Sequence, residues 1–149
     1  MAHLLDSSIL LRHTNPSDPL HLVAANAILT LHRQGEVLHT APQIFTEFRC
    51  VVTRPADVNG LGLSSAEAQA KAAIYEAEFP LLLETPELFV SWKALVEAAD
   101  VRGKQVHDAR LIAICQVYGI TNILTFNVRH FTRMAAFVPG LVIIDPTSI

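Results

Sequence analysis

Three carboxylates and one amide stand beside strongly apolar stretches of this chain. They are Asp6 after one apolar run, Glu47 within a second, Asp108 before a third and Asn127 after a fourth. Charges so close to a core are costly unless something compensates them. Oxygen donors of this kind suit Mg²⁺ or Mn²⁺. If the four segments are neighbours in one small domain, the sequence predicts a single oxygen-lined metal site.

Such a site predicts metal-assisted hydrolysis of a phosphodiester bond. A bound cation offsets the repulsion that otherwise raises the pKa of clustered carboxylates. Two divalent ions about 3.5 to 4 Å apart can activate a water and stabilise the leaving oxygen. The chemistry therefore needs no nucleophilic side chain.

The elements that must position these groups alternate along the chain. Short apolar runs predict five strands at 4–5, 37–40, 81–83, 120–125 and 141–144. Amphipathic or capped stretches predict helices at 7–12, with a serine at the cap, and at 20–33, from 42, 64–79, 86–101 and 109–118. Strands separated by helices indicate an α/β fold with a mostly parallel sheet and helices on both faces. Ligands of such sheets gather beyond the carboxyl ends of the strands, where Asp6 and Asn127 fall.

The composition fits one cytoplasmic domain spanning 1–149. A chain of 149 residues with 51% hydrophobic residues and a mean hydropathy of +0.36 can fill one core. No run approaches the roughly 18 apolar residues of a membrane span, and Asp6 interrupts any signal-peptide pattern. Cys50 and Cys115 have apolar neighbours and no C-x-x-C spacing, which predicts small buried side chains in a reducing compartment.

Charge is distributed unevenly, although the net charge is only −3. Acidic residues outnumber basic ones in 57–101. The segment 102–133 contains a single acid, Asp108, and five basic residues: Arg102, Lys104, Arg110, Arg129 and Arg133. We expect Lys104, Arg129 and Arg133 to line a groove for nucleic acid phosphates beside the metal site.

Four motifs in this order resemble the PIN-domain ribonucleases, especially the VapC-type toxins of bacterial toxin–antitoxin pairs: Asp6-Ser7-Ser8-Ile9-Leu10, Thr46-Glu47-Phe48, His107-Asp108-Ala109-Arg110-Leu111-Ile112-Ala113 and Thr125-Phe126-Asn127-Val128-Arg129-His130-Phe131. The resemblance covers nearly the whole chain. It implies a three-layer PIN-like domain, a Mg²⁺- or Mn²⁺-dependent endoribonuclease, an RNA substrate and a cognate antitoxin protein.

The resemblance also assigns roles to individual residues. It places Asp6, Glu47 and Asp108 in the catalytic, metal-binding core, with the hydroxyls of Ser8 and Thr125 nearby. In the family a fourth acid often stands where this chain has Asn127. An amide oxygen can ligate a hard cation but adds no negative charge, so one bound ion and two remain alternatives.

Several side chains in or near the motifs have alternative interpretations. Arg110 either holds phosphate or, as we favour, orients an acid of the cluster by ion pairing. His107 and His130 adjoin the motifs without fitting a zinc site. As structural alternatives, Asp6 and Asn127 would be helix caps, and Asp108 would only favour a helix N-terminus.

Two other functions compete with the nuclease. A phosphotransferase would use Asp6 as a covalent nucleophile, but the haloacid-dehalogenase pattern requires an aspartate where Ser8 stands. A degenerate domain would bind RNA or protein without cleaving it. The apolar excess and the amphipathic helices at 20–33 and 64–79 further predict a homodimer.

Overall fold

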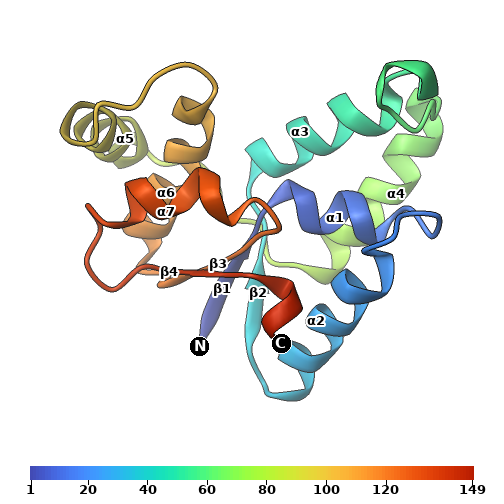
Figure 1. The fold of residues 1–149 in the computed structure, drawn as a ribbon, viewed down its shortest axis with the longest axis horizontal. Coiled ribbons are helices and arrows are strands. Elements are labelled where there is room, and N and C mark those ends of the chain that lie inside the picture. The colour runs from blue at the N-terminus through green and yellow to red at the C-terminus, as the bar shows by residue number, and fades with distance from the viewer.

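The computed structural model covers residues 1–149 and consists of a parallel sheet flanked by helices (Figure 1). The strands are β1 Ala2–Leu5, β2 Val37–His39, β3 Asn122–Leu124 and β4 Val142–Ile144. The helices are α1 Ser7–His13, α2 His21–Arg33, α3 Pro42–Thr53, α4 Ser65–Glu78, α5 Pro86–Ala98, α6 Gln105–Tyr118 and α7 Val128–Ala135. Two short 3₁₀ turns, Ala56–Val58 and Pro146–Ser148, complete the chain. The predicted α/β class is confirmed.

All strand pairs in the sheet are parallel, and the strand order is β2-β1-β3-β4. Leu5 at the end of β1 pairs with Leu124 at the end of β3, which brings these carboxyl ends level. The chain first adds β2 on one side of β1 and later adds β3 and β4 on the other. The strand order therefore reverses between β1 and β3, and this is where open α/β sheets bind their ligands.

The expected strand at 81–83 is the one departure in the sheet. Only a parallel bridge between Leu81 and Thr40 forms there. Proline at 80 and at 86 has no backbone N–H to donate, so a hydrogen-bonded ladder cannot extend past either end of this segment. The sheet has four strands and a single-bridge extension beside β2.

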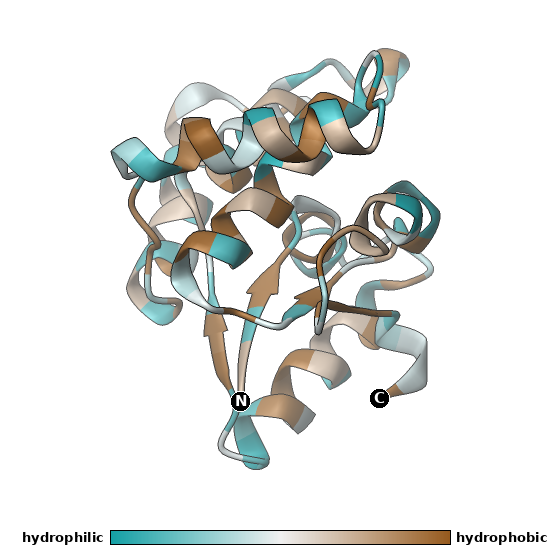
Figure 2. Ribbon diagram, turned by 90° about the vertical axis from the view of Figure 1, so that its left-hand side faces the viewer, coloured by the Kyte–Doolittle hydropathy of each residue, from teal (hydrophilic) through white to brown (hydrophobic).

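Helices cover both faces of the sheet. Figure 1 shows α2 on one side of the strands and α6 and α7 on the other. The strands are mostly hydrophobic and lie in the middle of the molecule in Figure 2. They contribute to one core cluster of 33 buried residues, in which Phe48, Phe79 and Phe131 are the largest fully buried side chains. None of the seven helices combines the length and apolar character that crossing a lipid bilayer demands.

The helix ends agree in part with the sequence signals. Ser64 and Glu67 form the predicted capping box of α4, and Gly119 ends α6 in a left-handed conformation with a φ of 68°. The predicted serine cap of α1 is wrong, because Asp6 occupies the N-cap position. Helix α6 begins at Gln105, so Asp108 lies within its first turn. The sequence patterns predict no helix at Val128–Ala135, where the structure has α7.

Candidate active site

The carboxyl ends of β1 and β3 meet at the point where the strand order reverses, and polar residues follow both strands. The backbone N–H of Asp6 donates to the carbonyl of Leu124 at 3.0 Å, which continues the pairing beyond β1. The backbone N–H of Thr125 likewise donates to Ile144 in β4 at 3.0 Å. These main-chain bonds fix Asp6 and Thr125 at the same edge of the sheet.

The Asp6 carboxylate is buried and held by two hydroxyl groups. Its Oδ2 accepts hydrogen bonds from Ser8 Oγ at 2.6 Å and from Thr125 Oγ1 at 2.7 Å. These hydroxyls in turn accept the backbone N–H groups of Phe126 at 3.2 Å and Asn127 at 2.9 Å. Asp6 is the N-cap residue of α1 by position, but its side chain makes no capping hydrogen bond to that helix. Its Oδ1 accepts no hydrogen bond within the protein.

Glu47 reaches the same region from α3, and both of its carboxylate oxygens are held. Ser7 Oγ donates to Oε2 and Gln43 Nε2 to Oε1, each at 2.8 Å. Gln43 Nε2 also donates to the backbone carbonyl of His107 at 2.8 Å. The amide of Gln43 thus ties Glu47 on α3 to the first turn of α6.

Asp108 approaches from the first turn of α6. Its Oδ2 lies 3.5 Å from Nδ1 of His130 on α7. Burial raises the pKa of Asp108 from 3.8 to about 6, and the negative charges of Asp6 and Glu47 add to the effect, whereas His130 and His107 oppose it. The three carboxylates therefore lie close enough to repel one another.

The three predicted acids line one cavity of about 530 Å³. Its lining residues are Asp6, Ser7, Gln43, Thr46, Glu47, Cys50, Val51, Lys104, His107, Asp108, Asn127 and His130. Asn127 is the N-cap residue of α7, yet its side chain makes no capping hydrogen bond and lines the cavity instead. All four predicted metal-site residues share this one cavity.

Comparison with known families identifies the fold. The PIN domain family matches residues 3–136. This chain belongs to the PIN domain family. The resemblance seen in the four motifs is confirmed, and the PIN domain accounts for nearly the whole chain.

Solved structures give the same fold assignment for this PIN domain. VapBC2 from Rickettsia felis, bound to a DNA fragment from its promoter, has a TM-score of 0.71 at 14% identity, covering 97% of this chain and 98% of that one. VapC20 from Mycobacterium tuberculosis, a sarcin-ricin loop cleaving toxin, has a TM-score of 0.65 at 22% identity over 94% and 96%. VapBC-1 from nontypeable Haemophilus influenzae has a TM-score of 0.69 at 14% identity over 99% of each chain. No curated protein sequence matches this PIN domain significantly.

The basic residues of the PIN domain are placed unevenly around the cavity. Lys104 lines it, and Arg129 is exposed on α7 outside the lining. Arg133 donates to the backbone carbonyl of Ala99 at the end of α5, so its side chain links α7 to α5 and does not line the cavity. Arg110 pairs with Glu84, outside the acidic cluster, and donates to Gln43 Oε1 at 3.2 Å. The expected ion pair between Arg110 and an acid of the cluster is therefore wrong, and Arg110 is linked to Glu47 only through Gln43, which accepts from Arg110 and donates to Glu47.

Sequence reasoning missed two residues and misplaced a third. Ser7 and Gln43 hold Glu47, and Gln43 has a signal in the sequence because it precedes Glu47 by four residues on one helix. Cys50 is exposed and lines the acidic cavity, so the expectation that it is buried is wrong. It lies on the face of α3 that also carries Glu47 rather than on the buried face. Cys115 is buried as expected.

The donor set of the cavity fits a hard divalent cation in its chemistry. No three aspartate, glutamate, histidine or cysteine side chains are assembled in a ready-made metal geometry. However, carboxylate and amide oxygens are the ligands that Mg²⁺ and Mn²⁺ prefer. Burial is the main cause of the raised pKa of Asp108, and the negative charges of Asp6 and Glu47 add to it; a cation in the cavity would offset that added repulsion.

The raised pKa of Asp108, caused by burial and by repulsion from Asp6 and Glu47, predicts a pH-dependent gain in stability for Asp108→Asn in metal-free protein. Below about pH 3.8 Asp108 is protonated in both the folded and unfolded states, so its ionisation costs nothing. Between that pH and about 6 the unfolded state ionises first, and the folded state loses stability. Above pH 6 the ionised Asp108 lowers the free energy of unfolding by roughly 2 to 3 kcal/mol, and the asparagine variant avoids this loss.

Urea unfolding in EDTA at pH 4 and pH 7.5 measures this difference. We expect the variant to exceed the wild type in free energy of unfolding at pH 7.5, with a much smaller gap at pH 4. Asp57→Asn, at an exposed acid outside the cavity, serves as the matched control. A gap of equal size at both pH values would contradict the electrostatic account of Asp108.

Proposed function

We propose that this PIN domain is a metal-dependent endoribonuclease. The observation that carries the proposal is the meeting of Asp6, Glu47 and Asp108 in one cavity, at the strand-order reversal of a PIN fold. The three acids come from β1, α3 and α6, and each of those elements is fixed by the core or by main-chain hydrogen bonds. RNA phosphodiesters are the substrate class that a hard-cation site of this kind would hydrolyse.

Asp6, Glu47, Asp108 and Asn127 are the residues that would hold Mg²⁺ or Mn²⁺. When bound, such an ion lowers the pKa of a coordinated water and stabilises negative charge on the reacting phosphate and the leaving oxygen. Ser8 and Thr125 hold Asp6 by donating to Oδ2, which leaves Oδ1 without a hydrogen bond in the protein and free to ligate such an ion. Ser7 and Gln43 fix both oxygens of Glu47 in the same way. These outer hydrogen bonds pre-organise the ligands.

RNA would approach the cavity from its basic rim. Lys104 lines the same cavity as Asp108, and its ammonium can neutralise a substrate phosphate. Arg129 is exposed on α7, two residues after the N-cap residue Asn127, and can contact the RNA strand farther along. Arg133 contributes less, because its guanidinium already binds the carbonyl of Ala99. His130 offsets the charge of Asp108 in the absence of an ion.

The biological setting that we propose is that of a toxin paired with an antitoxin in the cytoplasm. Structures of the same fold come from VapBC toxin–antitoxin complexes, and one such toxin cleaves the sarcin-ricin loop. Exposed apolar side chains on α2 and α4, namely Leu22, Leu29 and Ile74, support a protein-binding surface for an antitoxin or a second copy of the chain. A homodimer is part of this proposal.

The direct test is cleavage of structured RNA by purified, partner-free protein with Mn²⁺ or Mg²⁺. We expect endonucleolytic products that disappear when EDTA is added. Cleavage that persists undiminished in EDTA would overturn the metal-dependent mechanism. RNA binding without cleavage would indicate the degenerate domain, and accumulation of phosphorylated protein would indicate covalent chemistry at Asp6.

A further inference from the structure

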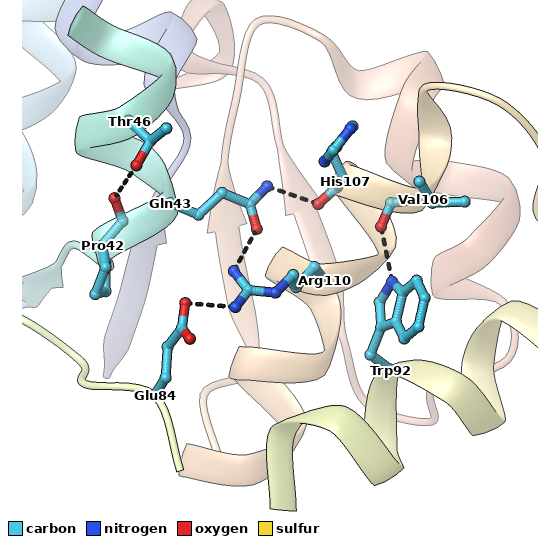
Figure 3. Close-up of a pocket in the computed structure, with 8 residues that line it drawn as sticks. All are labelled: Pro42, Gln43, Thr46, Glu84, Trp92, Val106, His107 and Arg110. Carbon is cyan, nitrogen blue, oxygen red and sulfur yellow. Dashed lines mark hydrogen bonds and ion pairs between the residues drawn. The ribbon is translucent and has the colours of Figure 1, made fainter. Parts of the chain in front are cut away.

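A second hollow of about 400 Å³ adjoins the acidic cavity between α3, α5 and α6 (Figure 3). Its lining residues are Pro42, Gln43, Thr46, Glu84, Trp92, Val106, His107 and Arg110. Gln43, Thr46 and His107 also line the acidic cavity, so the two spaces meet along α3 and the first turn of α6. A ligand that occupies one can extend into the other.

Trp92 gives this hollow an aromatic side. Its indole Nε1 donates to the backbone carbonyl of Val106 at 2.8 Å, which fixes the ring of α5 against the start of α6. The side chain is only half-buried and borders the hollow (Figure 3). An ordered, accessible aromatic ring offers a flat stacking surface, since its one polar atom is already satisfied within the protein.

Charged and polar groups line the hollow beside the ring. Figure 3 shows Arg110 between Glu84 and Trp92, with Gln43 next to its guanidinium. Arg110 uses one N–H group toward Glu84 and one toward Gln43, and a guanidinium carries five. The Glu84 side chain is 45% exposed and has a second oxygen without a partner. Planar donors and an acceptor thus lie beside an aromatic surface.

We propose that this hollow binds one unpaired nucleobase of the RNA substrate, stacked on Trp92 and hydrogen-bonded by Arg110 and Glu84. The inference rests on the proposed nuclease function, which brings RNA to the acidic cavity. Proteins that read single-stranded RNA stack splayed bases on aromatic rings or guanidinium planes and contact their polar edges. Every base presents an acceptor next to an N–H donor, which complements the neighbouring Arg110 and Glu84.

The network through Gln43 connects this base site to catalysis. Gln43 accepts from Arg110 and donates to Glu47, so one side chain contacts both the base site and the acidic cluster. A base held beside Arg110 therefore positions the adjoining phosphate near the acids. Trp92, Arg110 and Glu84 act as substrate-positioning residues, and none of them lines the acidic cavity.

Trp92 is the only tryptophan of the chain, so tryptophan fluorescence reports on the surroundings of this one ring, which borders the hollow and, beside Phe89, a smaller neighbouring one. The first experiment titrates wild-type protein in EDTA with a single-stranded RNA and with a sugar-phosphate oligomer of equal length that lacks bases. We expect saturable quenching by the RNA and little change with the abasic oligomer. Equal responses to both, or no fluorescence change at any RNA concentration, would overturn the proposal. This readout does not depend on cleavage.

The second experiment measures cleavage of RNAs carrying one abasic nucleotide at successive positions around the cut site. We expect wild-type kcat/KM to fall roughly tenfold at one position, the scale of a lost base–aromatic stack. Trp92→Ala should lose about the same factor on intact RNA and nothing further on that abasic RNA. Additive losses would show that Trp92 does not contact this base and would overturn the proposal.

Two further variants separate stacking from a general effect on folding. Trp92→Phe keeps an aromatic ring and should retain most of the activity and the full sensitivity to the abasic position. Phe137→Ala removes an exposed aromatic side chain from outside the hollow and should behave as the wild type. If wild-type protein cleaves no RNA at all, the proposed function fails, and the fluorescence titration still decides whether the hollow binds a base.

Discussion

Replacing Asp6 with asparagine will lower the single-turnover rate of RNA cleavage by more than about 100-fold. Loss of an outer hydrogen-bond partner of a metal ligand already costs roughly 10- to 100-fold in metal affinity or activity. Asp6 is the most deeply buried of the three acids, and because the surrounding hydroxyls donate to Oδ2, its Oδ1 is left free to ligate a cation. The asparagine side chain has the same shape and can still accept from Ser8 and Thr125.

The fold should survive this substitution, because the neutral side chain also relieves repulsion with Asp108. Far-ultraviolet circular dichroism and the urea midpoint verify that the variant is folded. Asp57→Asn makes the same chemical change at an exposed site and should cleave at the wild-type rate. If the folded Asp6→Asn variant retained near wild-type activity, our assignment of the acidic cavity would be wrong.

Replacing Thr125 with valine will reduce cleavage by roughly 10- to 100-fold, the usual effect of losing an outer partner of a metal ligand. The Thr125 side chain is fully buried and its hydroxyl serves two groups at once. It donates to Asp6 Oδ2 at 2.7 Å and accepts the backbone N–H of Asn127 at 2.9 Å. Valine supplies neither bond, so Asp6 Oδ2 loses one of its two hydrogen bonds and the backbone N–H of Asn127, at the start of α7, loses its acceptor.

A positioning role predicts rescue by the conservative change Thr125→Ser, which retains the hydroxyl. It also predicts that Thr125→Val needs more Mn²⁺ for half-maximal activity, whereas a purely structural role would lower stability alone. The expected loss of stability is about 1 to 3 kcal/mol for the unpaired N–H. Thr132→Val, at an exposed threonine of α7, is the matched control. Full activity in folded Thr125→Val would contradict the role given to this hydroxyl.

The structure brings the four predicted site residues into one cavity, and for two of them the sequence contains the reason. Asp6 and Asn127 follow apolar strands, and in a parallel sheet such strands end at one edge. The strand at 81–83 fails because apolar character alone cannot tell a paired strand from an extended segment between two prolines. Helix α6 starts at Gln105, four residues before the predicted start at Ala109, and its N-cap residue Lys104 makes no side-chain capping bond that the sequence could signal.

Contacts between distant segments are what the sequence does not contain. The bond between Ser7 and Glu47 joins residues on α1 and α3, and that between Trp92 and Val106 joins α5 to α6. Charge patterning along the chain correctly groups Lys104 with Asp108 but cannot foresee that Arg133 binds a backbone carbonyl. Such partners depend on helix orientation, which is set by packing rather than by local pattern.

The most direct test of the acidic site is the dependence of single-turnover RNA cleavage on free Mn²⁺, measured for wild-type protein and for Asp6→Asn. We predict a saturable rise in the wild-type rate from a baseline near zero, and a variant that stays far below it or needs a much higher Mn²⁺ concentration. A wild-type rate that does not change with Mn²⁺, or two superimposable curves, would contradict the assignment of these carboxylates as the metal-dependent catalytic centre.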